Sequence, residues 1–163
     1  MNASVNTMIV GIGATLLTDL WGAIRVRVFG VPAPNYCWVG RWMARIACGR
    51  FAPIPIGTLP PLRAECAIGW AAHYSIGVLF AAMLIGVCGI EWLRAPVFTP
   101  ALAVGVLTVI APFLIMQPGM GAGIAASRTP KPTLARLHTV ATHAVFGTGL
   151  YVSARVVNYI WQA

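Results

Sequence analysis

Acidic residues are almost absent from this sequence, which has three Asp and Glu against 11 Lys and Arg in 163 residues. Charged residues of both signs make up only 9% of the chain, whereas about a quarter is usual in soluble proteins. In their place stand 59% hydrophobic residues, with a mean hydropathy of +0.82. This scarcity of charge excludes a soluble fold and predicts a single integral membrane domain over residues 1–163.

The motifs of common enzymes and of nucleic-acid-binding proteins are missing as well. The sequence has no Ser/His/Asp hydrolase motif and no HExxH zinc helix. The spacing Gly119-x-Gly121-x-Gly123 is that of a dinucleotide loop, but it follows an apolar helix rather than a strand, so we discount it. The basic residues are scattered over loops without a recognition motif, which argues against nucleic acid as a partner. We therefore favour a protein that is not an enzyme.

The four cysteines form neither a Cys-x-x-Cys pair nor the spacing of a zinc finger. They are Cys37, Cys48, Cys66 and Cys88. Because they fall within predicted spans or on the predicted cytoplasmic side, where thiols stay reduced, we interpret them as small apolar packing residues.

Four stretches of the chain are apolar and long enough to cross a bilayer, which takes about 20 residues in a helix. They cover about residues 8–28, 66–90, 99–117 and 137–159. The amino terminus has neither the basic residue nor the cleavage site of a secretory signal, so we expect the first span to be retained. The sequence predicts an all-α polytopic membrane protein whose four transmembrane helices form a bundle.

Most basic residues lie in two segments, one between the first and second spans and one between the third and fourth. By the positive-inside rule both segments face the cytoplasm, and both termini then lie outside. In the first segment Trp38 and Trp42 share one helical face, with Arg41 and Arg45 on the opposite face. We predict a short interfacial amphipathic helix in this first cytoplasmic loop, with both tryptophans at headgroup depth.

Three of the apolar stretches carry one ionisable side chain well inside, namely Asp19, His73 and His143. Such groups are costly in hydrocarbon and usually face protein or water, so they indicate a functional site. At helical rise they lie roughly 9 to 12 Å from the same face of the membrane, so they are candidates for one shared site, and the rotation of each helix decides whether they meet. The same end of the third span carries three further candidates, which are Met116, Gln117 and Met120.

Spans two and four share the pattern His-x-x-x-Gly, as His73 with Gly77 and His143 with Gly147. This spacing puts the histidine and the glycine on one helix face. The absent glycine side chain leaves room there for either a close neighbouring helix or a ligand beside the imidazole.

Two prolines interrupt the third span and its end. Pro112 lacks an N–H and crowds the preceding turn, and Pro118 opens a glycine-rich segment. Irregular backbone at membrane depth is tolerated where it is buried in protein or lines a wet cavity, as in the broken helices of transporters. Beyond this segment lie Ser127, Arg128 and Lys131, which we predict to contact an anion or a lipid headgroup.

A carboxylate and two imidazoles suit several chemistries, which the sequence leaves open. They form a proton relay, because imidazole titrates near neutrality. They also match a two-His, one-carboxylate iron site, whereas Met116 and Met120 would favour Cu(I). Two histidines on different helices, His73 and His143, also suit the axial positions of a haem. Alternatively, Asp19 bonds a histidine across an interface and only fixes helix rotation.

The leading hypothesis is transport or permeation of a proton, cation or small solute through the site of Asp19, His73 and His143. The rival is a haem- or metal-binding redox protein that uses the two histidines as ligands. A third hypothesis is a structural subunit of a membrane complex. The lipid bilayer is the expected partner, and a homo-oligomer is expected if a pathway exists, because a bundle of four spans is thin.

Four groups of motifs, spread over nearly the whole chain, carry a family resemblance. They are Gly11-Ile12-Gly13-Ala14-Thr15 with Asp19-Leu20-Trp21, Asn35-Tyr36 with Val39-Gly40-Arg41-Trp42, Ala72-His73-Tyr74 with Gly77, and Ala111-Pro112-Phe113-Leu114-Ile115-Met116-Gln117-Pro118-Gly119-Met120-Gly121. These segments resemble the bacterial inner-membrane family catalogued as domain of unknown function 2938. The resemblance implies a four-helix protein of the bacterial inner membrane, and the family brings no known activity, substrate or catalytic residues.

Overall fold

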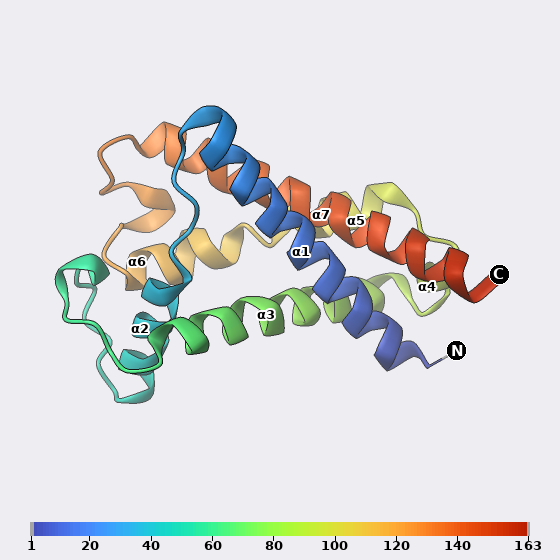
Figure 1. The fold of residues 1–163 in the computed structure, drawn as a ribbon, viewed down its shortest axis with the longest axis horizontal. Helices are drawn as coiled ribbons and strands as arrows, with labels where there is room; N and C mark the ends of the chain where they lie inside the picture. Colours follow the sequence, from blue (N-terminus) through green and yellow to red (C-terminus); the bar gives the residue numbers. More distant parts are fainter. Residues whose placement is uncertain (1, 163) are drawn as a thin grey trace. The chain divides into compact units, whose positions relative to one another are not determined.

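The computed structural model describes residues 2–162, with side chains for residues 2–160, and this part of the chain contains helices but no strand. The helices in chain order are α1 (Ala3–Phe29), α2 (Tyr36–Ala47), α3 (Glu65–Cys88), α4 (Glu91–Arg94), α5 (Phe98–Leu107), α6 (Gln117–Gly119) and α7 (Pro132–Gln162) (Figure 1). Two 3-10 turns, Ile56–Thr58 and Ile124–Ala126, and a π-helix, Pro112–Met116, complete the described elements. The predicted all-α class is confirmed.

Three helical stretches are long and apolar enough to cross a membrane, and they match the first three predicted spans. They are Ala3–Phe29, Glu65–Cys88 and Phe98–Gly119. The third is not one regular helix, because α5 continues through the π-helix into α6. Helix α7 has 31 residues, but its described part does not reach the same apolarity, since residues such as Thr142, His143 and Arg155 interrupt it.

Both ends of α1 follow from the local sequence. The Asn2 side chain accepts hydrogen bonds from the backbone N–H groups of Ser4 and Val5, at 3.1 and 3.4 Å, and so caps the first turn. At the other end Gly30 adopts a left-handed conformation with φ of 64°, and its N–H bonds back to the last turn. The chain reverses at this glycine, which brings the following segment back beside the end of α1.

The chain forms two compact units, each built from separate stretches of sequence. The first unit consists of Met1–Ala33, Tyr74–Thr108 and Ala141–Ala163, and the second of Pro34–His73 and Val109–Val140. Helices α3 and α7 each contribute residues to both units. Of the three ionisable side chains, Asp19 and His143 belong to the first unit and His73 to the second.

An apolar core from α1, α3, α4, α5 and α7 holds the first unit together. Its buried members are Val10, Ala14, Ala81, Leu84, Trp92, Leu93, Ala101, Val104, Phe146, Leu150, Ala154 and Val157. Glycines allow the helices to approach closely, since a β-carbon at Gly147 would lie 2.8 Å from the Ala101 carbonyl oxygen. Gly77 faces the Thr15 hydroxyl on α1 at similarly close range. The glycine of each His-x-x-x-Gly pattern therefore accommodates a neighbouring helix.

In the second unit, α2 packs on the first two turns of α3 through a pair of glycines. A β-carbon at Gly40 would collide with the Glu65 carbonyl, and one at Gly69 would collide with the Tyr36 carbonyl. Arg41, which the pattern predicted on the polar outer face of α2, is buried at 6% exposure. The amphipathic helix is confirmed as a helix, and the face that carries Arg41 packs against α3 and the following loop. Its position at the membrane surface stays a prediction.

The two tryptophans of α2 lie against backbone of the same unit. A β-carbon at Gly57 would lie 3.0 Å from Cζ2 of Trp38, and Gly119 is similarly close to the indole of Trp42. Trp38 keeps 41% of its surface exposed. Both tryptophans therefore serve as packing residues, which the prediction of headgroup anchors did not include.

The backbone is irregular from Pro112 to the start of α7. The π-helix begins at Pro112, whose missing N–H leaves a gap in the α-helical hydrogen-bond ladder. Further on, Gly121 has a φ of 83° and Gly123 a φ of 77°, values that favour glycine. Ala125 and Ala126 also have positive φ, so this turn holds backbone that L residues rarely adopt.

Candidate intramembrane polar site

Asp19 lies on α1 and bonds to a tyrosine of α3 within the first unit. The Tyr74 hydroxyl donates to Oδ2 of Asp19 at 2.8 Å, and both side chains are partly buried. Thr15 and Thr18 are buried on the same helix, and their hydroxyls donate to carbonyls of α1 itself. The structure thus adds Tyr74, which the sequence interpretation missed, as a hydroxyl that binds the carboxylate inside a span.

A second ionisable group of the first unit is Arg25, near the end of α1. An arginine at the end of an apolar helix usually extends to the lipid headgroups. Arg25 is instead only 5% exposed, and its guanidinium donates to the Thr142 hydroxyl at 3.1 Å and to the Pro32 carbonyl at 3.2 Å. The chain reversal after Gly30 supplies that carbonyl, and this contact cannot be read from local sequence.

His143 lies on α7 and bonds to a threonine of α5, also within the first unit. The Thr108 Oγ1 is 2.8 Å from Nδ1 of His143, and the same hydroxyl donates to the Gly105 carbonyl. Thr108 is buried at 5% exposure, and His143 is partly buried. Each of the three ionisable groups described so far, Asp19, Arg25 and His143, therefore contacts a hydroxyl from another helix.

His73 lies on α3 in the second unit, within a group of aromatic rings. Its imidazole stacks on the Tyr36 ring at a centroid distance of 4.0 Å and an interplanar angle of 24°. The Trp70 ring lies 5.9 Å from His73 and 4.6 Å from Tyr36. The convergence of His73 with Asp19 and His143 stays a prediction.

The three candidates at the end of the third span also belong to the second unit. The amide nitrogen Nε2 of Gln117 donates to the Thr139 hydroxyl at 3.4 Å, while its buried Oε1 has no partner among the described residues. The Met120 carbonyl accepts from the Ile56 N–H at 3.1 Å. Met116 is the last residue of the π-helix, and Gln117 and Met120 follow it in and after α6. All three candidates therefore lie within the irregular backbone around Pro112 and Pro118.

The predicted anion or headgroup contacts lie just before α7 begins. Ser127, Arg128 and Lys131 are exposed, and α7 starts at Pro132. The Arg128 N–H bonds to the Ala122 carbonyl at 2.8 Å, which closes the turn. Exposed cations at this place suit a headgroup contact, and the contact stays a prediction.

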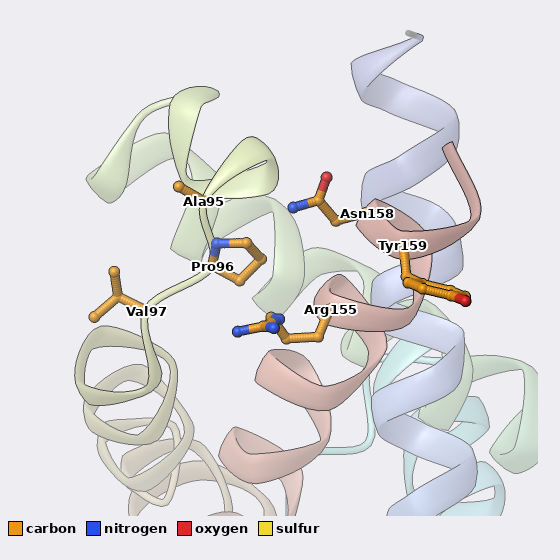
Figure 2. Close-up of a pocket in the computed structure, with 6 residues that line it drawn as sticks. All are labelled: Ala95, Pro96, Val97, Arg155, Asn158 and Tyr159. Atoms are coloured by element: carbon orange, nitrogen blue, oxygen red, sulfur yellow. The ribbon is translucent and has the colours of Figure 1, made fainter. Parts of the chain in front are cut away.

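The first unit also contains a cavity of about 330 Å³ at the end of α7 (Figure 2). Its lining comes from the connection between α4 and α5 and from α7, and consists of Ala95, Pro96, Val97, Arg155, Asn158 and Tyr159. Neither Asp19 nor His143 lines it. The cavity is therefore separate from the polar groups of the spans.

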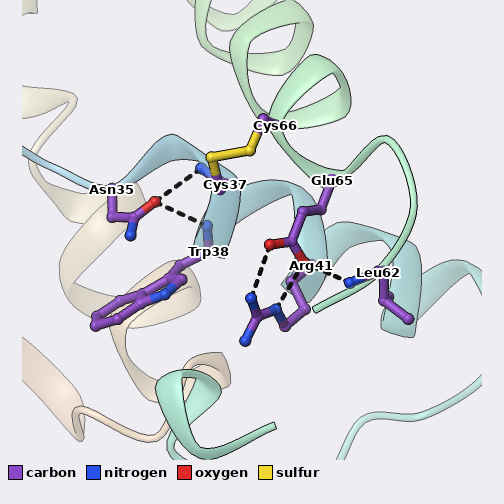
Figure 3. Close-up of a disulfide and its surroundings, with 7 residues drawn as sticks. All are labelled: Asn35, Cys37, Trp38, Arg41, Leu62, Glu65 and Cys66. Atoms are coloured by element: carbon purple, nitrogen blue, oxygen red, sulfur yellow. Dashed lines mark hydrogen bonds and ion pairs between the residues drawn. A yellow bond between two sulfur atoms is a disulfide. The ribbon is translucent and has the colours of Figure 1, made fainter. Parts of the chain in front are cut away.

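The second unit contains a buried ion pair that the sequence interpretation also missed. Arg41 binds Glu65 through two hydrogen bonds of 2.7 Å, and Glu65 also accepts from the Leu62 N–H at 2.8 Å (Figure 3). The same guanidinium donates to the carbonyls of Ile56 and Leu59. The bond to Glu65 raises the pKa of Arg41 above its usual value, so this side chain stays charged and ties the loop to α2 and α3.

Next to this ion pair a disulfide joins α2 to α3, which corrects the interpretation of all four cysteines as packing residues. Cys37 and Cys66 form the bridge, whereas Cys48 and Cys88 are free (Figure 3). The two partners are 29 residues apart in sequence and belong to no recognisable motif, so spacing alone could not pair them. They meet because Gly40 and Gly69 allow α2 and α3 to come into backbone contact.

Among the residues whose side chains are described, no three His, Cys, Asp or Glu lie close enough to hold a metal ion. This finding gives no support to an iron site built on a carboxylate and two imidazoles. A haem held by His73 and His143 alone would not need such a group, and it stays a prediction.

Three helices of the described chain are long and apolar enough to cross a membrane, and the first of them carries Asp19, whose carboxylate accepts from the Tyr74 hydroxyl. These features are consistent with a helical membrane protein. The chain belongs to the family described as protein of unknown function (DUF2938), whose sequence profile matches residues 8–157. No curated protein and no solved structure matches it significantly. The family has no assigned activity, so only the side chains of this protein indicate a function.

Proposed function

We propose that this protein moves a proton, cation or small solute across the bacterial inner membrane through the polar groups of its spans. The observation that carries the proposal is the bond between Asp19 and Tyr74, which retains an ionisable carboxylate inside an apolar helix. Such a group is expensive in hydrocarbon, and membrane proteins keep it where ions or protons pass.

The other polar contacts of the first unit support the same proposal. Arg25 bonds to Thr142, and His143 bonds to Thr108. A hydroxyl both donates and accepts hydrogen bonds, so Thr108 can exchange a proton with the His143 imidazole, whereas Arg25 stays protonated and supplies a fixed positive charge. Hydroxyl contacts at all three ionisable groups are more than is needed to fix helix rotation, for which a single bond suffices.

The proposed topology has four spans, with α7 as the fourth and both termini outside. Thirty-one residues extend roughly 46 Å as a helix, more than the hydrocarbon thickness of about 30 Å. The basic residues of the two loops, which the positive-inside rule puts in the cytoplasm, support this orientation. They are Arg25, Arg27, Arg41, Arg45, Arg50, Arg63, Arg128, Lys131 and Arg136.

Proton flux into liposomes that contain the purified protein tests the proposed function. With a pH-sensitive dye inside and a potassium diffusion potential as the driving force, we expect flux above that of empty liposomes. Asp19→Asn should lower it by roughly tenfold or more, because the amide cannot take up a proton. The amide oxygen still accepts from the Tyr74 hydroxyl, so this variant should fold.

Glu91→Gln is the matched control for that measurement. Glu91 is exposed on α4 and pairs with Arg94 at 2.8 Å, so its loss removes a carboxylate without touching the polar groups of the spans. Flux should stay at the level of the unmodified protein. Equal flux in Asp19→Asn and the unmodified protein would contradict a role for the carboxylate.

An optical spectrum of the purified protein separates transport from the redox alternative. A Soret band that disappears in His73→Ala would replace the transport proposal with haem binding. A spectrum with protein absorption only, together with flux that depends on Asp19, is the expected result.

A further inference from the structure

The cavity at the end of α7 has walls that hydrogen bonds hold in place. The Asn158 amide donates to the Arg94 carbonyl at 2.6 Å, which ties α7 to the end of α4. The indole N–H of Trp92 donates to the Val97 carbonyl at 3.1 Å, which closes the turn that forms the opposite wall. Trp92 is itself 5% exposed and belongs to the core. The cavity is therefore anchored to the buried core of the first unit.

Arg155 gives this cavity a positive charge, and no other lining residue is charged. Its guanidinium lies 5.9 Å from the centre of the Tyr151 ring and donates to the Tyr151 hydroxyl at 3.3 Å. Tyr151 packs in turn on Phe98 at the start of α5, with ring centres 5.5 Å apart. Arg155 is exposed, and these contacts favour a position of its guanidinium at the rim of the cavity.

No carboxylate pairs with Arg155 in the part of the chain that the structure describes. The acidic residue closest to the cavity wall in sequence, Glu91, is already paired with Arg94. Figure 2 shows the side chains of Arg155 and Asn158 reaching from α7 toward the Ala95–Val97 wall, while the Tyr159 ring points the other way. The cavity thus offers an uncompensated guanidinium beside an apolar wall.

We propose that this cavity binds the phosphate group of an anionic phospholipid, with Arg155 as its ligand. A guanidinium is suited to phosphate because its planar N–H groups bond two oxygens at once. Pro96 and Val97 offer an apolar surface to the part of the lipid next to the phosphate. A volume of about 330 Å³ is at the lower end of known ligand pockets, which suits a headgroup.

The position of the cavity in the chain supports a lipid rather than a soluble ligand. Arg155 and Tyr159 lie near the end of α7, which is the outer end of the fourth span in the topology proposed above, and the inference rests on that topology. Arginine and tyrosine at the end of a span are typical of the headgroup region. The lipid contact predicted at Ser127, Arg128 and Lys131 would lie at the opposite end of this helix.

Titration of the detergent-solubilised protein with lipids, followed by its melting temperature, tests this assignment. Phosphatidylglycerol should raise the melting temperature, whereas diacylglycerol, which lacks the phosphate, should not. Inorganic phosphate is the third arm, and a weaker effect than that of the lipid is expected. In Arg155→Gln the apparent dissociation constant for phosphatidylglycerol should rise by about tenfold, the usual effect of losing a charge-assisted bond.

Arg94→Gln is the matched control, because it removes an arginine at the same end of the molecule whose guanidinium pairs with Glu91 and does not line the cavity. Its affinity for phosphatidylglycerol should change by less than about twofold. If Arg155→Gln folds poorly, Arg155→Lys retains the cation, and we expect weaker lipid binding than in the unmodified protein but stronger than in a neutral variant.

Three results would overturn the assignment. Equal lipid affinity in Arg155→Gln and the unmodified protein would remove Arg155 as the ligand. An equal response to diacylglycerol would show that acyl chains, and not the phosphate, stabilise the protein. A full response to inorganic phosphate alone would make the ligand a free anion. Lipid binding is measured without proton flux. Failure of the lipid assignment is therefore distinguishable from failure of the proposed transport function.

Discussion

Gly40→Ala is expected to prevent α2 from packing on α3 and so to destabilise the second unit. The added β-carbon would collide with the Glu65 carbonyl and would lie 2.6 Å from the Gly69 nitrogen. Overpacked cores usually lose about 1–3 kcal/mol, and a clash with main-chain atoms of both turns belongs at or above the upper end of this range. Chemical unfolding in detergent, followed by circular dichroism, measures the loss.

The control for this substitution is Gly86→Ala on the same helix that Gly40 contacts. A β-carbon at Gly86 meets no atom within 4 Å, and alanine favours the helix by about 1 kcal/mol over glycine. The control should therefore be as stable as the unmodified protein or slightly more stable. Similar stabilities for Gly40→Ala and Gly86→Ala would contradict the close crossing of α2 and α3.

Loss of the bridge in Cys37→Ser should lower the free energy of unfolding of the oxidised protein by about 3.6 kcal/mol. The bridge joins residues 29 apart, and in the chain-entropy model a closed loop of this length restricts the unfolded chain by about this amount. A reductant should destabilise the unmodified protein to the same degree and leave Cys37→Ser unchanged. Unfolding curves with and without dithiothreitol measure both effects.

Cys48→Ser is the matched control for the disulfide. Cys48 is free and exposed just after the last residue of α2, so its replacement removes a thiol without removing the bridge. The variant should keep the stability of the unmodified protein and the full response to dithiothreitol. If dithiothreitol did not change the unfolding curve of the unmodified protein, Cys37 and Cys66 would not form a stabilising bridge.

The same cysteines report which side of the membrane the basic loops face. Disulfides persist in oxidising compartments, whereas the cytoplasm keeps thiols reduced. With the basic loops in the cytoplasm, as proposed, Cys37 and Cys66 should react with a membrane-permeant maleimide in intact cells and pair only after isolation. A bridge already present in intact cells would reverse the proposed orientation.

The sequence predicted the parts of this fold that depend on local composition. Three apolar stretches became helices of membrane-crossing length, because burial in hydrocarbon requires an uninterrupted apolar run. The π-helix at Pro112 also follows from a local cause, since a missing N–H disturbs the helix wherever proline occurs. The fourth stretch, in α7, carries more polar residues, so its apolar run is interrupted and it is less apolar than the other three.

The contacts between helices could not be predicted, because they depend on rotation about each helix axis. Asp19 and His143 were identified as unusual, but their observed partners, Tyr74 and Thr108, carry no signal of their own in an apolar stretch. Arg41 followed the amphipathic pattern of α2, and only the position of Glu65 on another helix shows which face is buried.

The bond from the Thr108 hydroxyl to the Gly105 carbonyl bears on which ring nitrogen of His143 carries the proton. A threonine hydroxyl has one hydrogen, and when that hydrogen is donated to the Gly105 carbonyl, the hydroxyl oxygen accepts from Nδ1 of the imidazole in the tautomer that is protonated there. The neutral ring then has its lone pair on Nε2, which is the nitrogen where a proton must arrive. In the proposed relay, onward transfer from Nδ1 through Thr108 requires its hydroxyl to turn away from Gly105, so the rotation of this one side chain would control the transfer.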